Sequence, residues 1–164
     1  MTFTKTTDLC DAHPELVRVA DPIFRSFGGR AEFEGAIATL KLHEDNALVR
    51  EALSKPGDGR VLVIDGGGSM RRALVGDQLA ALAQRNGWSG IVVHGCIRDA
   101  ADIAQIAIGV LALGTHPRKS DKRAHGIAGE PVTFAGVTFT PGEHAWIDVD
   151  GLVVAPRRLE LPAG

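Results

Sequence analysis

Residues 71–83 of the chain, RRALVGDQLAALA, change from the pattern of a β-strand to that of an α-helix. Arg71–Val75 is typical of a strand, and apolar residues recur at helical spacing from Leu79 onward. Gly76 and Asp77 form the turn between them. Glycine lets the backbone approach a ligand closely, Asp77 can cap the helix, and the first free N–H groups of a helix point at an anion. The stretch therefore predicts a strand–turn–helix unit that can bind a carboxylate or a phosphate.

A second unit of the same kind follows. The apolar strand Ile91–Val93 is expected to end at Gly95, after which Arg98 and Asp99 open a helical segment. On a helix, Asp99 and Asp102 share a face because they are three residues apart. Hard cations such as Mg²⁺ take carboxylate ligands, and arginine binds a carboxylate through two hydrogen bonds. Because two parallel units place both turns at one end of a sheet, the sequence predicts a divalent-metal site for a small keto-acid there.

The same residues have a simpler interpretation. Asp is among the commonest helix-capping residues, so Asp77 and Asp99 can be ordinary N-caps. Arg98 would then form a surface ion pair. The spacing alone leaves both interpretations open.

The spacing of Asp77, Arg98-Asp99 and Asp102, with twenty residues between the first two terms, resembles a known pattern. It is similar to that of the 4-hydroxy-4-methyl-2-oxoglutarate aldolases and their relatives named regulator of ribonuclease E activity A. The resemblance covers nearly the whole chain, and further matching stretches are 8–11, 26–30, 44–46, 59–69, 90–95, 117–120 and 136–139. It implies an α/β fold of the swivelling β/β/α type, formed by a single domain over residues 1–164 and assembling as a homotrimeric ring.

The resemblance also implies roles for the residues of the site. Asp99 would bind Mg²⁺ or Mn²⁺ directly, and Asp102 would hold one of the waters on that metal. Arg98 would bind the keto or enolate oxygen, and Asp77 would position the water that protonates the enolate. The N–H groups expected to hold the substrate carboxylate belong to Gly76, Asp77, Gln78 and Leu79.

The implied activity is the metal-dependent cleavage of 4-hydroxy-4-methyl-2-oxoglutarate to pyruvate. Aldol cleavage leaves a pyruvate enolate, whose charge is stabilised by a lysine Schiff base or by a metal ion. Lys41 is expected at an exposed strand edge and Lys119 and Lys122 in a basic loop, so the metal route is favoured. Oxaloacetate decarboxylation passes through the same enolate and is expected as a side activity. The alternative function is that of a non-catalytic regulator that binds ribonuclease E and modulates RNA turnover.

Three other stretches have both structural and functional interpretations. The glycine-rich turn 65–69 follows a buried strand, but the next segment is another strand, which disfavours a nucleotide or methyl-donor site. Residues 44–46 either reach the site or cap the following helix. The basic loop 116–126 is either solvated or supplies cations to a polyanionic substrate through Lys119 or Arg123.

The tail departs from the family pattern. Longer aldolases of the family are expected to contribute a further carboxylate to a neighbouring subunit's site. Glu160 is the only carboxylate after Ala155, and the adjacent arginines make an ion pair equally plausible.

Composition bounds the remaining possibilities. A length of 164 residues favours one domain, and a formal net charge of −2 gives no electrostatic basis for direct nucleic-acid binding. Cys10 and Cys96 are the only cysteines and have no metal-ligand spacing. The N-terminus lacks the apolar core of a signal peptide, and no apolar run approaches the length of a membrane span. A cytoplasmic protein without membrane contact is therefore expected.

Overall fold

A computed structural model describes residues 2–163, and parallel strands form the centre of its main sheet. The ten-stranded sheet has the order β1-β12-β11-β3-β4-β6-β7-β2, with β5 paired to β6 and β8 paired to β3. The parallel strands are β3 (Phe33–Leu42), β4 (Val61–Asp65), β5 (Ala73–Val75), β6 (Gly90–Ile97) and β7 (Gly109–Thr115). The antiparallel strands are β1 (Arg18–Val19), β2 (Arg25–Ser26), β8 (Gly126–Ala128), β11 (His144–Asp148) and β12 (Gly151–Ala155). A separate hairpin consists of β9 (Val132–Phe134) and β10 (Val137–Phe139).

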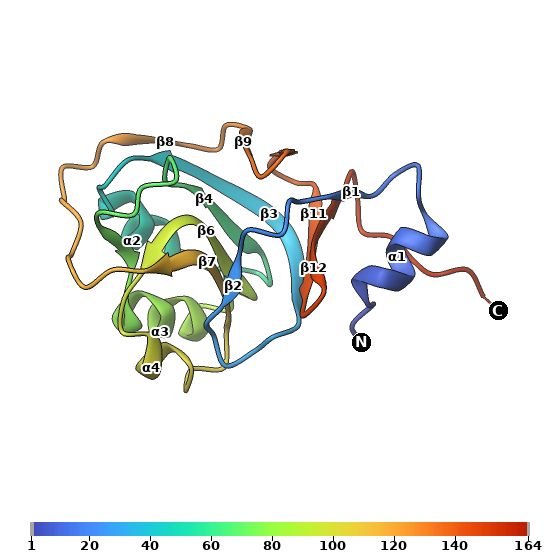
Figure 1. Ribbon diagram of the computed structural model, residues 1–164, viewed down its shortest axis with the longest axis horizontal. Coiled ribbons are helices and arrows are strands. Elements are labelled where there is room, and N and C mark those ends of the chain that lie inside the picture. The colour runs from blue at the N-terminus through green and yellow to red at the C-terminus, as the bar shows by residue number, and fades with distance from the viewer. Residues whose placement is uncertain (1, 164) are drawn as a thin grey trace.

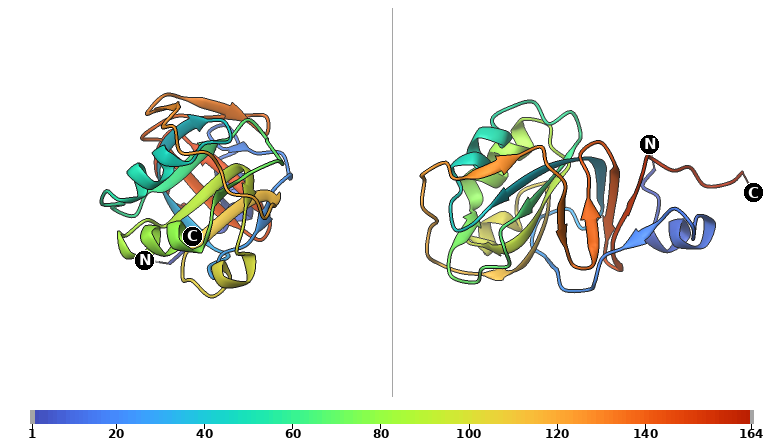
Figure 2. Two further views of the ribbon diagram at one scale, coloured as in Figure 1. Left: turned by 90° about the vertical axis from the view of Figure 1, so that its left-hand side faces the viewer. Right: turned by 90° about the horizontal axis from the view of Figure 1, so that it is seen from above.

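The helices lie at two ends of the molecule (Figure 1). Helices α2 (Ala47–Leu53), α3 (Asp77–Arg85) and α4 (Ala100–Ile103) gather beside the parallel strands. Helix α1 (Thr6–Ala12) lies at the opposite end with the C-terminal tail, as Figure 2 also shows. Within residues 2–163, no helix has both the length and the apolar character needed to cross a membrane.

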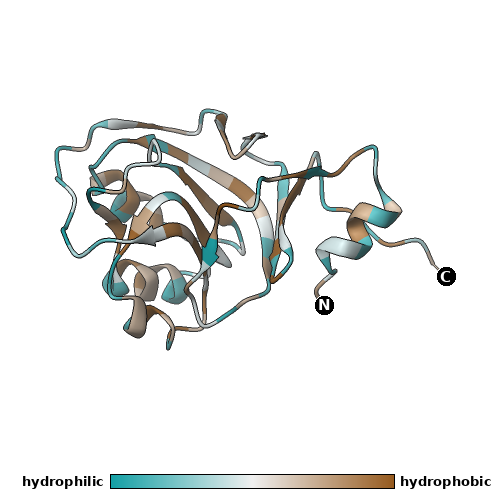
Figure 3. Cartoon of the chain, viewed as in Figure 1, coloured by the Kyte–Doolittle hydropathy of each residue, from teal (hydrophilic) through white to brown (hydrophobic). Residues whose placement is uncertain are grey.

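The two faces of the central strands belong to different hydrophobic clusters. Every residue of β4 is buried, and successive side chains of a strand point to opposite faces. Leu62 and Ile64 pack against the side that carries α2 and α3, whereas Val61 and Val63 pack toward the β9–β10 hairpin. Burial on both faces explains the continuous apolar run in the sequence, which appears as brown central strands in Figure 3.

Two glycines let an aromatic ring lie across neighbouring strands. A Cβ atom at Gly90 would lie 2.3 Å from the Phe33 ring, and one at Gly109 would lie 2.0 Å from it. Since Gly90 and Gly109 are paired across β6 and β7, they form a flat surface for the ring. The close approach requires glycine at both positions.

Strands β5, β6 and β7 end at the same edge of the sheet. Val75 pairs with Ile97, and Ile97 pairs with Thr115. The expected end of the strand at Gly95 is therefore two residues too early, because β6 continues to Ile97 beside β5 and β7. Register shifts between Ala73 and Val75 on β5, and after Val93 on β6, interrupt the pairing close to this edge. Such bulges re-aim side chains near the ends of strands.

Candidate active site

The two turns identified in the sequence lie side by side. The N–H group of Arg98 donates a hydrogen bond to the Val75 carbonyl oxygen at 2.9 Å. Gly76 follows β5 and Arg98 follows β6, so the parallel pairing places both residues at one edge of the sheet. The expectation that two strand–turn–helix units present their turns at the same end is confirmed.

Gly76 makes room for the Asp99 carboxylate. A Cβ atom at Gly76 would lie 2.8 Å from Asp99 Oδ2 and 3.6 Å from the Arg98 side chain. The glycine has an extended backbone, with φ −117° and ψ −171°, so a close approach and not an unusual backbone conformation requires it. Asp99 Oδ2 in turn accepts a hydrogen bond from the Asp77 N–H group at 3.2 Å.

The local structure corrects two details of the sequence interpretation. Gly76 is the N-cap of α3 and Asp77 is its first helical residue, so Asp77 does not cap the helix. Asp99 precedes α4 in a left-handed conformation with φ 58°, so the argument that Asp99 and Asp102 share a helix face does not apply. A non-glycine residue with positive φ is uncommon and tends to occur where the structure fixes a functional side chain.

Asp77 and Asp99 form a pair of interacting carboxyl groups. A hydrogen bond with Asp99, burial, and the negative charge of Asp99 together raise the pKa of Asp77 above its ordinary value, and Asp102 contributes least to this shift. Two carboxylates in contact repel one another unless a proton or a cation lies between them. The Asp77–Asp99 pair can therefore hold either a proton or a cation.

A cavity of about 380 Å³ contains this pair. Its wall includes Arg98 and Asp99 together with all four residues expected to contact the substrate through their backbone. Arg98 forms no ion pair in the part of the chain that the structure describes, so its guanidinium group is available to a ligand. The complete lining is Asn46, Arg50, Ala73, Gly76, Asp77, Gln78, Leu79, Arg98, Asp99, Lys119 and Lys122.

Four cations surround this cavity, and two of them were missed. Arg98 and Lys119 were considered from the sequence, whereas Arg50 and Lys122 were not given a role. Arg50 lies on α2, whose N-cap Asn46 also lines the cavity, and no motif in the sequence singled it out. Arg123 does not line the cavity. Its backbone N–H group donates a hydrogen bond to Asp45 and so helps to hold the loop.

The basic loop is held in place by Asp45. This buried carboxylate accepts hydrogen bonds from the N–H groups of Arg123 at 2.7 Å and Ala47 at 3.1 Å. Burial alone would raise the pKa of Asp45, but these backbone donors hold it below its ordinary value. The loop also pairs with β5, because Ser120 Oγ donates to the Ala73 carbonyl oxygen at 2.7 Å. Lys119 therefore reaches the cavity from an anchored segment.

Asp102 and Glu160 lie outside the main cavity. Asp102 is exposed on α4 and borders an adjoining hollow, of which Asp77 and Gln78 are also part. Glu160 pairs with Arg158 at 2.7 Å, in the tail that lies at the far end of the molecule from α3. Of the two roles considered for Glu160, a site carboxylate and an ion pair, the structure contains the ion pair.

The donor set fits a magnesium-like cation. No group of three or more His, Cys, Asp or Glu side chains arranged to hold a metal occurs within residues 2–163. Mg²⁺ commonly uses one or two protein carboxylates and completes its shell with water and substrate oxygens. Asp99, with Asp77 in contact, offers that kind of incomplete set. The repulsion between the two carboxylates is a reason for a cation to bind beside them.

The chain is similar to known proteins in sequence and in structure. The sequence model of the RraA-like family, described as Aldolase/RraA, matches residues 6–154. A protein of Ectopseudomonas mendocina named "Putative 4-hydroxy-4-methyl-2-oxoglutarate aldolase" is 58% identical over 157 residues, which cover 96% of this chain and 97% of that protein. A Pseudomonas aeruginosa protein of the same name is 57% identical with the same coverage.

Two solved structures have nearly the same fold. One, described as the RNA-processing inhibitor RraA from Thermus thermophilis, has a TM-score of 0.94 and 45% identity, over 97% of this chain and 96% of that one. The other, described as an S-adenosylmethionine: 2-dimethylmenaquinone methyltransferase from Geobacillus kaustophilus, has a TM-score of 0.94 and 47% identity, over 95% and 97% of the two chains.

Proposed function

Because the chain belongs to the RraA-like family, with its single α/β domain and mixed sheet, we propose that it is a divalent-metal-dependent aldolase. Its substrate would be 4-hydroxy-4-methyl-2-oxoglutarate, which is cleaved to pyruvate, and oxaloacetate decarboxylation would be a side activity. The names of the relatives that are 58% and 57% identical support the aldolase. The observation that carries the proposal is the Asp77–Asp99 pair facing Arg98 in one cavity at the strand ends.

Asp99 would hold Mg²⁺ or Mn²⁺ in this site, and Asp102 would hold a water bound to the ion. When bound, the cation supplies positive charge that stabilises the developing enolate. Gly76 supports this role of Asp99, because a side chain at position 76 would displace the Asp99 carboxylate. Exposure of Asp99 leaves room for water and substrate oxygens around it.

Arg98 and Asp77 would act on the reacting atoms. The Arg98 guanidinium group would donate hydrogen bonds to the keto oxygen and stabilise it as negative charge develops during cleavage of the C3–C4 bond. Asp77 would position the water that takes the proton of the 4-hydroxyl group as the C3–C4 bond breaks and delivers a proton to C3 of the enolate, so that two pyruvate molecules form. The hydrogen bond with Asp99 raises the pKa of Asp77 above its ordinary value.

The second carboxylate of the substrate would meet the remaining cations. The N–H groups at the start of α3 would bind one carboxylate, although the Asp77 N–H group is shared with Asp99. Lys119, Lys122 and Arg50 line the rest of the cavity. A dicarboxylate is therefore a better match than pyruvate alone.

The lysines require a test of the rival Schiff-base route. Lys119 and Lys122 line the cavity, but both are exposed and lie beside charged groups, not in the apolar pocket that activates such a lysine. We expect that borohydride treatment with pyruvate leaves the mass of the protein unchanged. A trapped adduct on either lysine would replace the metal route with the covalent one.

The decisive experiment measures pyruvate release from 4-hydroxy-4-methyl-2-oxoglutarate and from oxaloacetate. Wild type is compared with Arg98→Ala and Asp99→Asn, each with Mg²⁺ and with chelator. We expect activity that requires the metal and that both substitutions abolish, while Arg123→Ala, a charge removed outside the cavity, stays active. Oxaloacetate turnover that survives Asp99→Asn would exclude the assigned metal ligand.

A regulatory function is the second candidate, favoured by the likeness to the RNA-processing inhibitor RraA. The chain would then bind ribonuclease E as a homotrimer and change RNA turnover without catalysis. Absence of turnover on both substrates, combined with metal-independent binding to ribonuclease E, would support it. Sedimentation equilibrium tests the homotrimer, which is proposed for both functions.

A further inference from the structure

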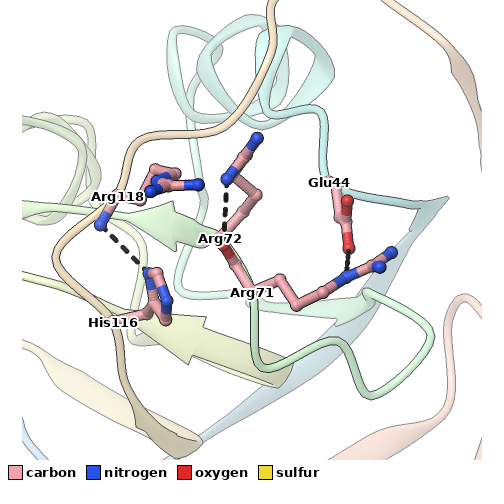
Figure 4. A pocket seen from close by; sticks show the side chains of 5 residues that line it. All are labelled: Glu44, Arg71, Arg72, His116 and Arg118. Atoms are coloured by element: carbon pink, nitrogen blue, oxygen red, sulfur yellow. Dashed lines mark hydrogen bonds and ion pairs between the residues drawn. The ribbon is translucent and has the colours of Figure 1, made fainter.

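An apolar pocket lies at the C-terminal end of α2, between that helix, β3 and the residues that lead into β4. It has a volume of about 400 Å³, and we call it the Trp88 pocket after the largest side chain in its wall. None of its residues lines the candidate active-site cavity. It also differs from the hollow drawn in Figure 4, whose wall consists of charged and polar side chains alone.

Small side chains leave the Trp88 pocket open. Ala36 and Ala38 on β3 and Ala52 on α2 line it and are only partly buried. Ala38 and Ala52 pack on the hydrophobic cluster that contains Leu62 and Trp88, and both of those residues also line the pocket. Larger apolar side chains would fill this space. The alanines instead leave apolar surface that a ligand can cover.

Two cations border the apolar surface, and no acidic side chain does. Lys55 is exposed and forms no ion pair within residues 2–163. The guanidinium group of Arg60 lies over the Trp88 ring, with 4.7 Å between its central carbon and the ring centroid. Arg60 Nε donates to the Gly57 carbonyl oxygen at 2.9 Å and Nη2 donates to the Pro56 carbonyl oxygen at 3.0 Å, so Nη1 is available to a ligand.

The carbonyl groups at the end of α2 do not oppose an anion there. A helix presents partial negative charge at its C-terminus, where the last carbonyl oxygens lack partners within the helix. Here the Leu53 carbonyl oxygen accepts a hydrogen bond from Asn86 Nδ2 at 2.8 Å, and the Lys55 carbonyl oxygen accepts one from Trp88 Nε1 at 3.1 Å. These bonds offset the negative charge and fix the Trp88 ring in the wall of the pocket.

We propose that the Trp88 pocket binds a small apolar carboxylic acid. The carboxylate would accept hydrogen bonds from Lys55 and Arg60, and the apolar body would cover the alanine methyl groups. A dicarboxylate fits less well, because its second charged group would lie on apolar surface without a partner. The volume lies in the range of small-molecule sites.

The pocket and the candidate active site share one helix. Ala52 and Lys55 line the Trp88 pocket at the C-terminal end of α2, whereas Asn46 and Arg50 line the active-site cavity from its N-terminal part. An acid held against Ala52 and Lys55 would therefore restrain the helix that carries Arg50. Binding in the pocket is independent of the proposed function, and only an effect on turnover rests on it.

Isothermal titration calorimetry on the full chain tests the proposal. Metal-free protein is titrated with benzoate, octanoate and benzamide, against chloride at equal ionic strength, which controls for general screening. Benzamide has nearly the shape of benzoate but no charge. We expect one saturable site per chain for the acids and at least tenfold weaker binding of benzamide. Preference for benzoate would assign the pocket to an aromatic acid, and preference for octanoate would assign it to an aliphatic one.

Tryptophan fluorescence locates the bound acid, because the chain has only two tryptophans. Trp146 is fully buried in a different hydrophobic cluster. Saturable binding should therefore change the emission of wild type with the affinity found by calorimetry. Trp88→Phe, which retains Trp146, should show no such change.

Substitutions separate the apolar contact from the charge. Ala38→Leu should fill the pocket and weaken binding by about tenfold or more without removing a charged group, and urea unfolding verifies that this variant is folded. Lys55→Ala should weaken binding by about tenfold, because it removes a charged hydrogen bond, and Lys55→Arg should recover most of the affinity. The controls Lys41→Ala, an exposed lysine of β3 outside the pocket, and Arg98→Ala, in the active-site cavity, should bind as wild type does.

Four results would overturn the proposal. They are absence of saturable binding above the chloride control, equal affinity for benzamide and benzoate, wild-type binding by Ala38→Leu, and loss of binding in Arg98→Ala. Tighter binding of a peptide that ends in an apolar residue with a free carboxylate would replace the small acid with a protein terminus. None of these results depends on whether the chain is an aldolase.

Discussion

Replacing Gly76 with alanine tests the geometry of the candidate active site without removing any charged group. The added Cβ atom would lie 2.8 Å from Asp99 Oδ2. The carboxylate must move by roughly 0.6 Å to reach ordinary van der Waals contact. That movement lengthens the 3.2 Å hydrogen bond from the Asp77 N–H group and displaces both carboxyl groups relative to Arg98.

We expect kcat/KM to fall by about a hundredfold, because misplacement of reacting groups by an ångström or less has effects of that order. This corresponds to about 2.7 kcal/mol of transition-state stabilisation. Stability should change little. Alanine tolerates the extended backbone at this position and gains roughly 0.4–1 kcal/mol by restricting the unfolded chain, which offsets the roughly 1 kcal/mol of a weakened hydrogen bond.

The assay combines pyruvate release over a range of Mg²⁺ concentrations with urea unfolding of the same preparations. Gly114→Ala is the matched control, because it lies on the neighbouring β7 and its Cβ atom would meet only the end of the flexible, exposed Met70 side chain at 3.1 Å. If Gly76→Ala had wild-type turnover and an unchanged requirement for Mg²⁺, the position of the Asp99 carboxylate would not matter and the assignment would be wrong.

Three further substitutions test other parts of the structure. Lys119→Ala should raise KM for the dicarboxylate by about tenfold with little change in kcat, whereas steady-state kinetics of Arg123→Ala should match wild type. Gly109→Ala should lower the free energy of unfolding in urea by roughly 1–3 kcal/mol, because its Cβ atom would overlap the Phe33 ring. Burial lowers the pKa of His144, so its contribution to stability is complete above the ordinary value of 6.5 and is lost as the pH falls below it. His144→Gln should therefore show a flatter dependence of unfolding free energy on pH in this range, and an unchanged slope would contradict the burial argument.

Local patterns were sufficient to predict the turns of the site. Glycine and aspartate between a strand and a helix have strong local preferences, and the parallel order of β5 and β6 brought Gly76 and Arg98 together as expected. The helix expected to follow residues 44–46 is confirmed, because α2 begins at Ala47 and ends at Leu53. The expected trimer, metal and residue roles stay predictions.

Contacts between residues far apart in the chain determine the features that could not be predicted from the sequence. Asp99 takes its left-handed conformation and accepts the Asp77 N–H group, a contact between residues 22 apart in the chain. Lys41 was expected at a strand edge, yet it pairs with Asp65 of β4 and Ile127 of β8, because the distant β8 returns to cover β3. Propensity and spacing carry no information about such a partner.

The acidic segment 44–46 meets both of the roles expected for it, because Asn46 is the N-cap of α2 and also lines the candidate active-site cavity. The positive φ of Glu44 turns the chain sharply as it leaves β3, so three consecutive side chains point to three places. Glu44 accepts a hydrogen bond from Arg71, and Asp45 accepts one from the N–H group of Arg123. Asn46 donates to the Leu74 carbonyl oxygen at 3.2 Å and lines the candidate active-site cavity. One short turn thus helps to hold the loop that carries Lys119 and Lys122.

The way the basic loop is held bears on the substrate specificity of the candidate active site. Arg118 and Lys119 lie on a loop whose residues from 121 to 130 are exposed, so little hydrophobic burial fixes its position. Its position depends instead on the Asp45 carboxylate, on the hydrogen bond from Ser120 Oγ to the Ala73 carbonyl oxygen, and on the pairing of β8 with β3. Losing the Asp45 carboxylate would remove the acceptor of the Arg123 N–H group, between Ser120 and β8, and Lys119 and Lys122 would then be held less firmly toward a second carboxylate. Binding of the distal group and chemistry at the keto group are therefore separable properties of this fold.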